Sequence, residues 1–286
     1  MSKVLTNRAA IEKTVAATMR AQPIVDMHTH VYAPSFGTPA PNKTGKTDPT
    51  GLLLWGLDEL RGIVVTEGDV TMGALTLFRD IAAHLLFQRE FPNLVRSAKV
   101  TGALAIQSRV SVGGNIANGS PAADTPPSLL AYGAELELTS LRGSRWVPYA
   151  DFHTGYKRSL LAPDELITRI RLPRLRVGGF HYFRKVGTRQ AQAIAKVSLA
   201  AWALVVDGRI QGLRLGLGSV APMPIRAKGT ERALLGQATG DLPLDAALAA
   251  LQTDISPIDD LRSSAAFRRR VAGNLLVDML KGLASA

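Results

Sequence analysis

The sequence predicts an α+β protein composed of two subdomains. Helical periodicity dominates the segment before residue 110, and a strong hairpin signal lies at Asp207-Gly208. Helical segments then continue up to residue 283. Early helices, a mixed middle and a late antiparallel sheet with terminal helices are typical of an α+β fold. With 46% hydrophobic and 20% charged residues, the 286-residue chain has the composition of a globular protein.

The first part of the chain divides near residue 55. Ile11, Val15 and Met19 recur at helical spacing and predict an amphipathic helix over residues 7–20. A short strand is expected over residues 24–27, followed by a loop rich in Pro, Gly and Thr over residues 34–51. This loop is the best candidate boundary. We therefore expect three units, listed in order: an atypical N-terminal segment over 1–55, a central subdomain over 56–175 and a C-terminal subdomain over 176–286.

Strand and helix signals alternate between residues 70 and 110. Residues 70–74 are expected to form a strand, and Thr76 is expected to cap one helix. The apolar side of that helix comprises Leu77, Ile81, Leu85 and Leu86. Pro92 is suited to open the next helix, because proline is tolerated in the first turn.

The remaining elements follow a loop predicted over residues 110–127. A Leu141-Arg142-Gly143-Ser144 turn predicts a hairpin, and Asp207-Gly208 predicts a second one. The expected strands are 134–139, 145–150, 165–172, 180–185, 194–206 and 210–219. The expected helices are 229–236, 243–252 and 264–283.

Composition excludes several kinds of function. The chain has no Cys, which excludes disulfides, thiolate zinc sites, a Cys nucleophile and iron-sulfur ligation by this chain. The net charge is +11, but the basic residues are scattered and form a run only at Arg268-Arg269-Arg270. We therefore expect no nucleic acid as partner, and assign the charge to an acidic partner subunit or a phosphate-bearing ligand.

No apolar run approaches the ~20 residues of a membrane span, and the absence of a signal-like segment before residue 22 favours a cytoplasmic protein.

The segment Ser111 to Asp124, SVGGNIANGSPAAD, is the most informative stretch of the sequence. Gly113 and Gly114 allow close approach of a ligand, and their N–H groups could form an anion-binding nest for a phosphate. Nearby hydroxyls and amides add neutral donors, and Asp124 supplies an acceptor. The alternative is an ordinary surface turn, because glycine pairs occur in many loops.

This segment resembles the central motif of the FAD-binding medium subunit of molybdenum hydroxylases, the group that contains xanthine dehydrogenase and carbon monoxide dehydrogenase. The resemblance covers roughly residues 56–286. The other segments that carry it are LDELRGI at 57–63, VTMGALT at 70–76, GYKRSLL at 155–161, ELI at 165–167, FRKVGTR at 183–189 and IAKVS at 194–198.

The resemblance implies a PCMH-type FAD-binding α/β subdomain followed by a subdomain of antiparallel sheet plus helices. It also implies a set of cofactor-binding residues but no catalytic or metal-binding residue. In that set Ser111, Val112, Gly113, Gly114 and Asn115 face the phosphate and ribityl side of FAD. Asp124 hydrogen-bonds the cofactor, Ile167 packs close to it, and Lys185 lies near the ring. The alternatives are a solvated strand lysine for Lys185 and a helix N-cap for Asp124.

The resemblance also implies partners. Electrons would leave an organic substrate at a molybdopterin large subunit and pass through an iron-sulfur small subunit. They would then reach FAD on this chain before an acceptor such as NAD. The absence of Cys suits this division, because the metal centres then belong to other subunits.

The N-terminal segment departs from this pattern. Residues 1–58 contain no Ala-Gly-Gly loop of the kind with which medium subunits hold the FAD pyrophosphate. Instead, residues 21–56 resemble the start of an amidohydrolase-like uronate isomerase, with His28 and His30 spaced to reach one metal. The alternative functions are therefore a flavin-free assembly or remnant protein and a metal-dependent amidohydrolase- or isomerase-like protein that uses His28 and His30.

Overall fold

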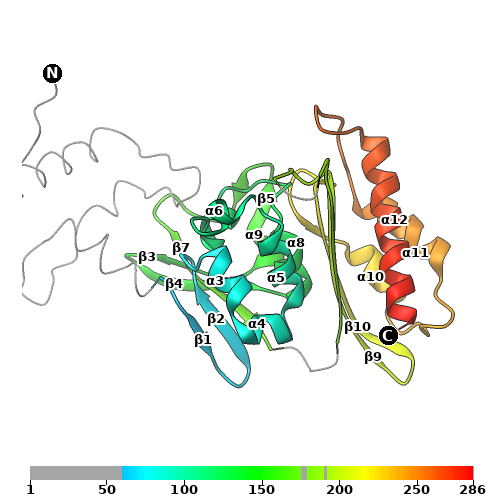
Figure 1. Ribbon diagram of the computed structural model, residues 1–286, viewed down its shortest axis with the longest axis horizontal. Helices are drawn as coiled ribbons and strands as arrows, with labels where there is room; N and C mark the ends of the chain where they lie inside the picture. Colours follow the sequence, from blue (N-terminus) through cyan, green and yellow to red (C-terminus); the bar gives the residue numbers. More distant parts are fainter. Residues whose placement is uncertain (1–59, 175–178, 190–191, 286) are drawn as a thin grey trace, which may run out of the picture.

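The computed structural model describes residues 60–174, 179–189 and 192–285 (Figure 1). The helix expected over residues 7–20, the strand over 24–27, the loop over 34–51 and the boundary near residue 55 lie outside these ranges. The described residues form a mixture of helices and antiparallel sheets, which confirms the α+β prediction.

The first body is a five-stranded antiparallel sheet with helices packed on it. The strand order is β1 (Ile63–Val65), β2 (Asp69–Gly73), β7 (Leu166–Pro173), β3 (Glu135–Ser140) and β4 (Gly143–Pro148). Its helices are α3 (Phe78–Ala83), α4 (Leu85–Glu90), α5 (Pro92–Lys99), α6 (Leu104–Gln107), α7 (Val112–Ala117), α8 (Pro126–Tyr132) and α9 (Tyr149–Phe152). A small pair, β5 (His153–Gly155) and β6 (Arg158–Ser159), follows α9.

The second body is a four-stranded antiparallel sheet covered by three helices. The strand order is β11 (Ile225–Arg226), β10 (Arg209–Gly218), β9 (Val197–Val206) and β8 (Phe180–Val186). The helices are α10 (Lys228–Leu234), α11 (Leu244–Asp254) and α12 (Ala265–Ala284). Asp207 and Gly208 link β9 to β10 with φ of 51° and 70°, the positive values that a tight hairpin turn requires.

The second sheet is buried on both faces where it meets the first body. Helix α8 packs on one face of β9 and β10, whereas α12 covers the other face of β9 (Figure 1). Residues 197–203 of β9 are therefore all buried, as in a strand covered on both sides. Trp202 of β9 belongs to the hydrophobic core of the first body, whereas Leu199 belongs to that of the second.

Buried hydrogen bonds also join the two bodies. The Asn93 side chain of α5 donates from Nδ2 to the carbonyl of Ala201 at 2.8 Å. The hydroxyl of Tyr132 accepts the Asn93 N–H at 2.9 Å and lies 3.0 Å from His181 Nδ1 of β8. The Asn93 side-chain amide and the Tyr132 hydroxyl would each lose a partner on the second body if the two bodies separated, so separation costs free energy.

Three expectations about the segment after residue 75 are wrong. The single helix expected after Thr76 is two helices, α3 and α4, because His84 between them adopts an extended conformation. Thr76 does not cap α3, since its hydroxyl donates to the Gly62 carbonyl at 3.3 Å. Leu85, expected on the apolar side, is 80% exposed.

The loop expected over residues 110–127 contains helix α7 and the start of α8. Ser111 caps α7 by accepting the Gly114 N–H at 3.2 Å, which offsets the low helix propensity of the glycine pair. Pro126 and Pro127 occupy the first turn of α8, where missing N–H groups cost little. Pro92 opens α5 as predicted.

Candidate functional site

A buried ion pair joins two residues that are far apart in the sequence. Lys185 Nζ on β8 lies 2.7 Å from Asp124 Oδ2, and the side chains are 7% and 8% exposed. Lys185 is therefore not the solvated strand lysine of the alternative. Asp124 is not the N-cap of α8 either, because Thr125 occupies that position.

The end of helix α5 completes this cluster. Lys185 Nζ also donates to the carbonyl of Val100 at 3.1 Å, the C-cap residue of α5. A cation is stabilised there by the partial negative charge of a helix C-terminus. The hydroxyl of Thr101 lies 3.2 Å from Asp124 Oδ2 and 2.8 Å from the Ser97 carbonyl. The sequence analysis did not identify Val100 or Thr101 as members of this cluster. Val100 takes part through its backbone carbonyl, which any residue type could supply, so its identity carries no signal.

One hydrogen-bond acceptor and one hydrogen-bond donor in this cluster remain available to a ligand. Asp124 Oδ1 is buried and has no hydrogen-bond partner among the described residues. Two acceptors use two of the three N–H groups of Lys185, so one donor is left. Burial raises the pKa of the Asp124 carboxyl above its usual range, although the Lys185 ammonium opposes this shift. An unsatisfied buried carboxylate oxygen is costly, and a ligand donor would remove that cost.

The glycine pair does not form an anion-binding nest. The Gly113 N–H donates to the Ala74 carbonyl at 2.8 Å, and the Gly114 N–H donates to Ser111 Oγ. Both glycines lie within helix α7, whereas a nest needs residues that alternate between right- and left-handed conformations. The nest interpretation is wrong because local helix formation uses the N–H groups. Donors that remain near α7 include the hydroxyl of Ser111 and the side-chain amide of Asn115.

The structure links α7 to the ion pair through Asn115. Its Oδ1 accepts the Thr125 hydroxyl at 2.6 Å, and Thr125 directly follows Asp124. Val112 of α7 and Ile167 of β7 are buried in the hydrophobic core of the first body. Ser111, Val112, Gly113, Gly114 and Asn115 are therefore connected to Asp124 and Lys185, whereas Ile167 lies among core side chains with 1% exposure. Contact of these residues with a cofactor stays a prediction.

A cleft of about 590 Å³ lies between the two bodies, and some of its lining residues closely precede Asp124 in the sequence. Ser120 and Ala122 line it from the first body, four and two residues before Asp124 respectively. Arg262 and Arg268 line it from the second. Arg268 is 6% exposed and donates to the Ser219 carbonyl at 3.0 Å and to Asp260 at 2.6 Å, while its Nε is buried without a partner among the described residues.

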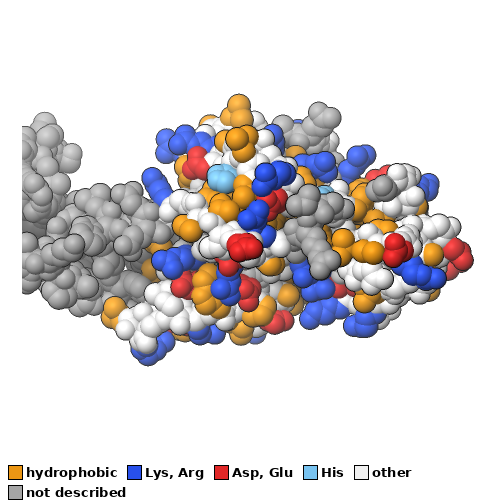
Figure 2. Space-filling view, turned by 90° about the horizontal axis from the view of Figure 1, so that it is seen from below, with side chains coloured by type: hydrophobic (Ala, Val, Ile, Leu, Met, Phe, Trp, Pro, Cys, Tyr) orange, Lys and Arg blue, Asp and Glu red, His pale blue; other side chains and the backbone are white. Residues whose placement is uncertain are grey.

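The part of the chain that the structure describes contains no group of three His, Asp or Glu side chains arranged to hold a metal ion. His28 and His30 lie outside it. Nor does any helix within the described ranges have the length and apolarity needed to cross a membrane. On the face seen in Figure 2, basic side chains are interspersed with acidic and apolar ones.

Comparisons with known proteins assign both bodies to flavoprotein families. Residues 45–175 match the family described as FAD binding domain in molybdopterin dehydrogenase. Residues 181–283 match the family described as CO dehydrogenase flavoprotein C-terminal domain. The resemblance of the N-terminal segment to a uronate isomerase concerns residues that the structure does not describe, and it stays a prediction.

Individual relatives agree with these matches. The xanthine dehydrogenase FAD-binding subunit of Escherichia coli O157:H7 is 33% identical over 216 residues, which cover 74% of this chain and 73% of that protein. The carbon monoxide dehydrogenase medium chain of Hydrogenophaga pseudoflava is 30% identical over 220 residues, covering 77% and 76%. A solved structure of carbon monoxide dehydrogenase from the same organism superposes with a TM-score of 0.75 at 30% identity, covering 79% of this chain and 78% of that one. This chain therefore belongs to the family of FAD-binding medium subunits of the xanthine and carbon monoxide dehydrogenases, which are components of oxidoreductases.

Proposed function

We propose that this chain holds FAD beside Asp124 and Lys185 and serves as the electron-transfer subunit of a molybdenum-hydroxylase-type complex. The observation that carries this proposal is the buried oxygen Asp124 Oδ1, which has no hydrogen-bond partner among the described residues. Asp124 lies in the segment that matches the FAD-binding domain family. We further propose a division into subdomains at residue 175. The two separate hydrophobic cores support this division.

The residues present fit a flavin nucleotide. FAD carries hydroxyl and ring N–H donors that suit Asp124 Oδ1, and acceptors that suit the remaining Lys185 N–H. Ser111 and Asn115 would offer neutral donors toward its phosphate and ribityl groups. When bound, the flavin supplies the capacity to take up electrons from one centre and release them to another. The chain itself orients the cofactor and sets the charge around it.

The ion pair changes what Lys185 can do. An isolated ammonium would favour a reduced, negatively charged flavin, which is a common way for a protein to tune a cofactor. Here the Asp124 carboxylate at 2.7 Å offsets that charge. Lys185 therefore acts chiefly through the direction of its remaining N–H, while Asp124 and the Val100 carbonyl fix its position.

The proposed partners follow from what this chain lacks. Iron-sulfur clusters need thiolate ligands, and this chain has no Cys, so a small subunit would carry the clusters that deliver electrons. A large subunit would carry the molybdopterin centre at which the organic substrate is oxidised. The net charge of +11 supports docking to partner surfaces that are acidic.

The 590 Å³ cleft, which we call the acceptor cleft, is suited to an anionic electron acceptor such as NAD. Among the described residues that line it, Lys157, Arg262 and Arg268 are basic and Asp260 alone is acidic, so the charge of this lining is positive. Tyr156 at its edge is 62% exposed and offers a stacking surface for a flat ring. Phosphate groups of a dinucleotide would be attracted to such a cleft.

A flavin titration of two matched variants tests the cofactor site. In Asp124→Asn the amide oxygen must face the Lys185 ammonium, so the NH₂ group takes the place of Oδ1 and an acceptor becomes a donor. We expect FAD to bind about 10- to 150-fold more weakly, which corresponds to one charge-assisted hydrogen bond. The same charge change at exposed Asp151 should leave affinity unaltered. Equal affinity of both variants would remove Asp124 from the site, and a wild-type complex without flavin would favour the flavin-free assembly protein.

The acceptor proposal is tested by the rate at which NAD reoxidises the reduced, FAD-loaded complex under anaerobic conditions. Arg262→Gln removes a half-exposed charge from the cleft and is expected to raise the apparent KM for NAD about two- to fivefold, with kcat unchanged. Arg270→Gln, on an exposed position of α12, serves as the control. Absence of NAD-dependent reoxidation in the wild type contradicts the assignment of NAD.

A further inference from the structure

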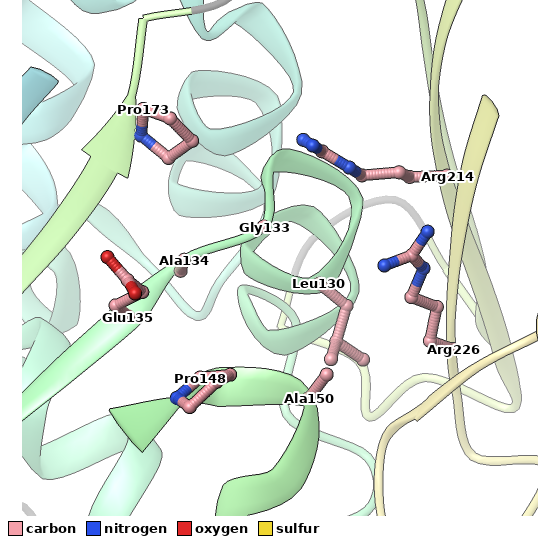
Figure 3. A pocket seen from close by; sticks show the side chains of 9 residues that line it. All are labelled: Leu130, Gly133, Ala134, Glu135, Pro148, Ala150, Pro173, Arg214 and Arg226. Atoms are coloured by element: carbon pink, nitrogen blue, oxygen red, sulfur yellow. The ribbon is translucent and has the colours of Figure 1, made fainter. Parts of the chain in front are cut away.

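A second crevice, of about 400 Å³, lies where α8 and the first sheet meet β10 and β11. We call it the seam pocket. Its wall on the first body is largely apolar and includes Leu130, Pro148 and Pro173, whereas its wall on the second body presents Arg214 and Arg226 (Figure 3). None of its lining residues belongs to the cluster of Asp124, Lys185, Val100 and Thr101, and none lines the acceptor cleft.

Arg214 carries a charge that no described carboxylate neutralises by an ion pair. Its Nη1 donates to the Tyr132 carbonyl at 3.3 Å, and its guanidinium lies 5.4 Å from the centre of the Trp202 ring. Gly133 makes room for this side chain, because a Cβ there would lie 3.1 Å from Nη1. Most of the five guanidinium donors thus have no acceptor among the residues that the structure describes.

Arg226 adds a second guanidinium whose orientation is fixed. Its Nε donates to both carboxylate oxygens of Glu231, at 2.8 and 3.0 Å. Glu231 is held in turn, because it accepts the Leu215 N–H at 2.8 Å. The two terminal nitrogens of Arg226 form no hydrogen bond with Glu231 and lie toward the pocket, as Figure 3 shows.

The charges around the pocket leave an excess of one positive charge. The carboxylate that lines it, Glu135, is bound by Arg171 at 2.7 Å, and Arg226 is balanced by Glu231. Arg214 is left over. Burial, and then repulsion by Arg226, lower the pKa of the Arg214 guanidinium below its ordinary value. Apolar walls reduce the local dielectric constant and so strengthen the attraction of an anion.

We infer that the seam pocket is an oxyanion-binding site, in which Arg214 and Arg226 together hold the phosphate or carboxylate group of a small molecule. Planar guanidinium groups match the geometry of such anions and bind them through paired hydrogen bonds. A bound anion contacts both bodies at once, and it supplies the counter-charge that Arg214 lacks. This inference does not depend on the flavin proposal.

Calorimetric titration of the full chain, saturated with FAD so that phosphate cannot enter the flavin site, tests this inference. Inorganic phosphate and succinate are titrated separately at one ionic strength, which distinguishes the two kinds of oxyanion. We expect at least one of them to bind in the low-millimolar range or tighter. Arg214→Met should weaken binding at least about tenfold, and Arg214→Lys should have a smaller effect because it keeps the charge but loses the planar fork.

Arg270→Gln, which removes the same charge from the far side of the second sheet, should leave binding unchanged. Circular dichroism shows whether each variant is folded, and Arg214→Lys still reports on the site if Arg214→Met is not. Lack of binding of either anion up to about 10 mM would overturn the inference. An equal loss of anion affinity in Arg214→Met and Arg270→Gln would also overturn the inference. Arg214 would then serve only to cap the C-terminus of α8.

Discussion

Replacing Asp124 by Ala is expected to lower the free energy of unfolding by about 3 to 5 kcal/mol, because Lys185 would remain buried without a counter-charge. The Lys185 side chain is 7% exposed, and its other acceptor is the neutral Val100 carbonyl. Water can therefore do little to solvate the ammonium. Urea unfolding of wild type and variant, with unchanged m-values, measures the difference.

A double variant separates the charge effect from lost packing. Lys185→Met in the Asp124→Ala background removes the unpaired ammonium and should restore most of the lost stability, because apolar replacements of buried ion pairs are often nearly neutral. Asp151→Ala, at an exposed position, should change stability by no more than about 0.5 kcal/mol. If the double variant were as unstable as Asp124→Ala, a buried charge would not be the cause.

Replacing Gly216 by Ala is expected to cost at least about 3 kcal/mol, at the upper end of the range for overpacked cores. A Cβ at this position would lie 2.1 Å from the Pro127 carbonyl oxygen and 2.8 Å from its carbon. These are backbone atoms in the first turn of α8, so relief requires the helix to move away from β10. Such a shift would disturb the packing between the two bodies.

The control for this change is Gly240→Ala. A Cβ at Gly240 meets nothing within 4 Å, and the residue is exposed. We expect a change within about 0.5 kcal/mol there. Similar unfolding midpoints for both variants would show that α8 and β10 can separate without cost, contrary to the close approach at Gly216.

Local signals predicted the hairpins and several helices correctly. The Asp207-Gly208 turn needs positive φ at two consecutive residues, and this requirement is written in the residue types themselves. Pro92 opens α5 for a similarly local reason. The prediction failed at residues 110–127, where the Ser111 cap and the contact of Gly113 with Ala74 overrode the low helix propensity of two glycines.

Within the candidate site, the sequence singled out Asp124 and Lys185 through family resemblance but not their pairing. They are 61 residues apart, and their contact depends on how β8 packs against the end of α5. Thr101 enters the cluster by the same packing, and nothing in its sequence context distinguishes it. The unpaired charge of Arg214 is also invisible in the sequence, because it depends on which carboxylates the second sheet brings near.

The sequence by itself determined the α+β class, the flavoprotein family and the absence of thiolate chemistry, because these depend on composition, periodicity and contiguous motifs. Only the tertiary structure decided which polar groups are buried together and which are left unsatisfied. The physical reason is that the energy of a buried charge depends on its neighbours in space. For Asp124 and Lys185, and for Arg214, those neighbours come from distant parts of the chain.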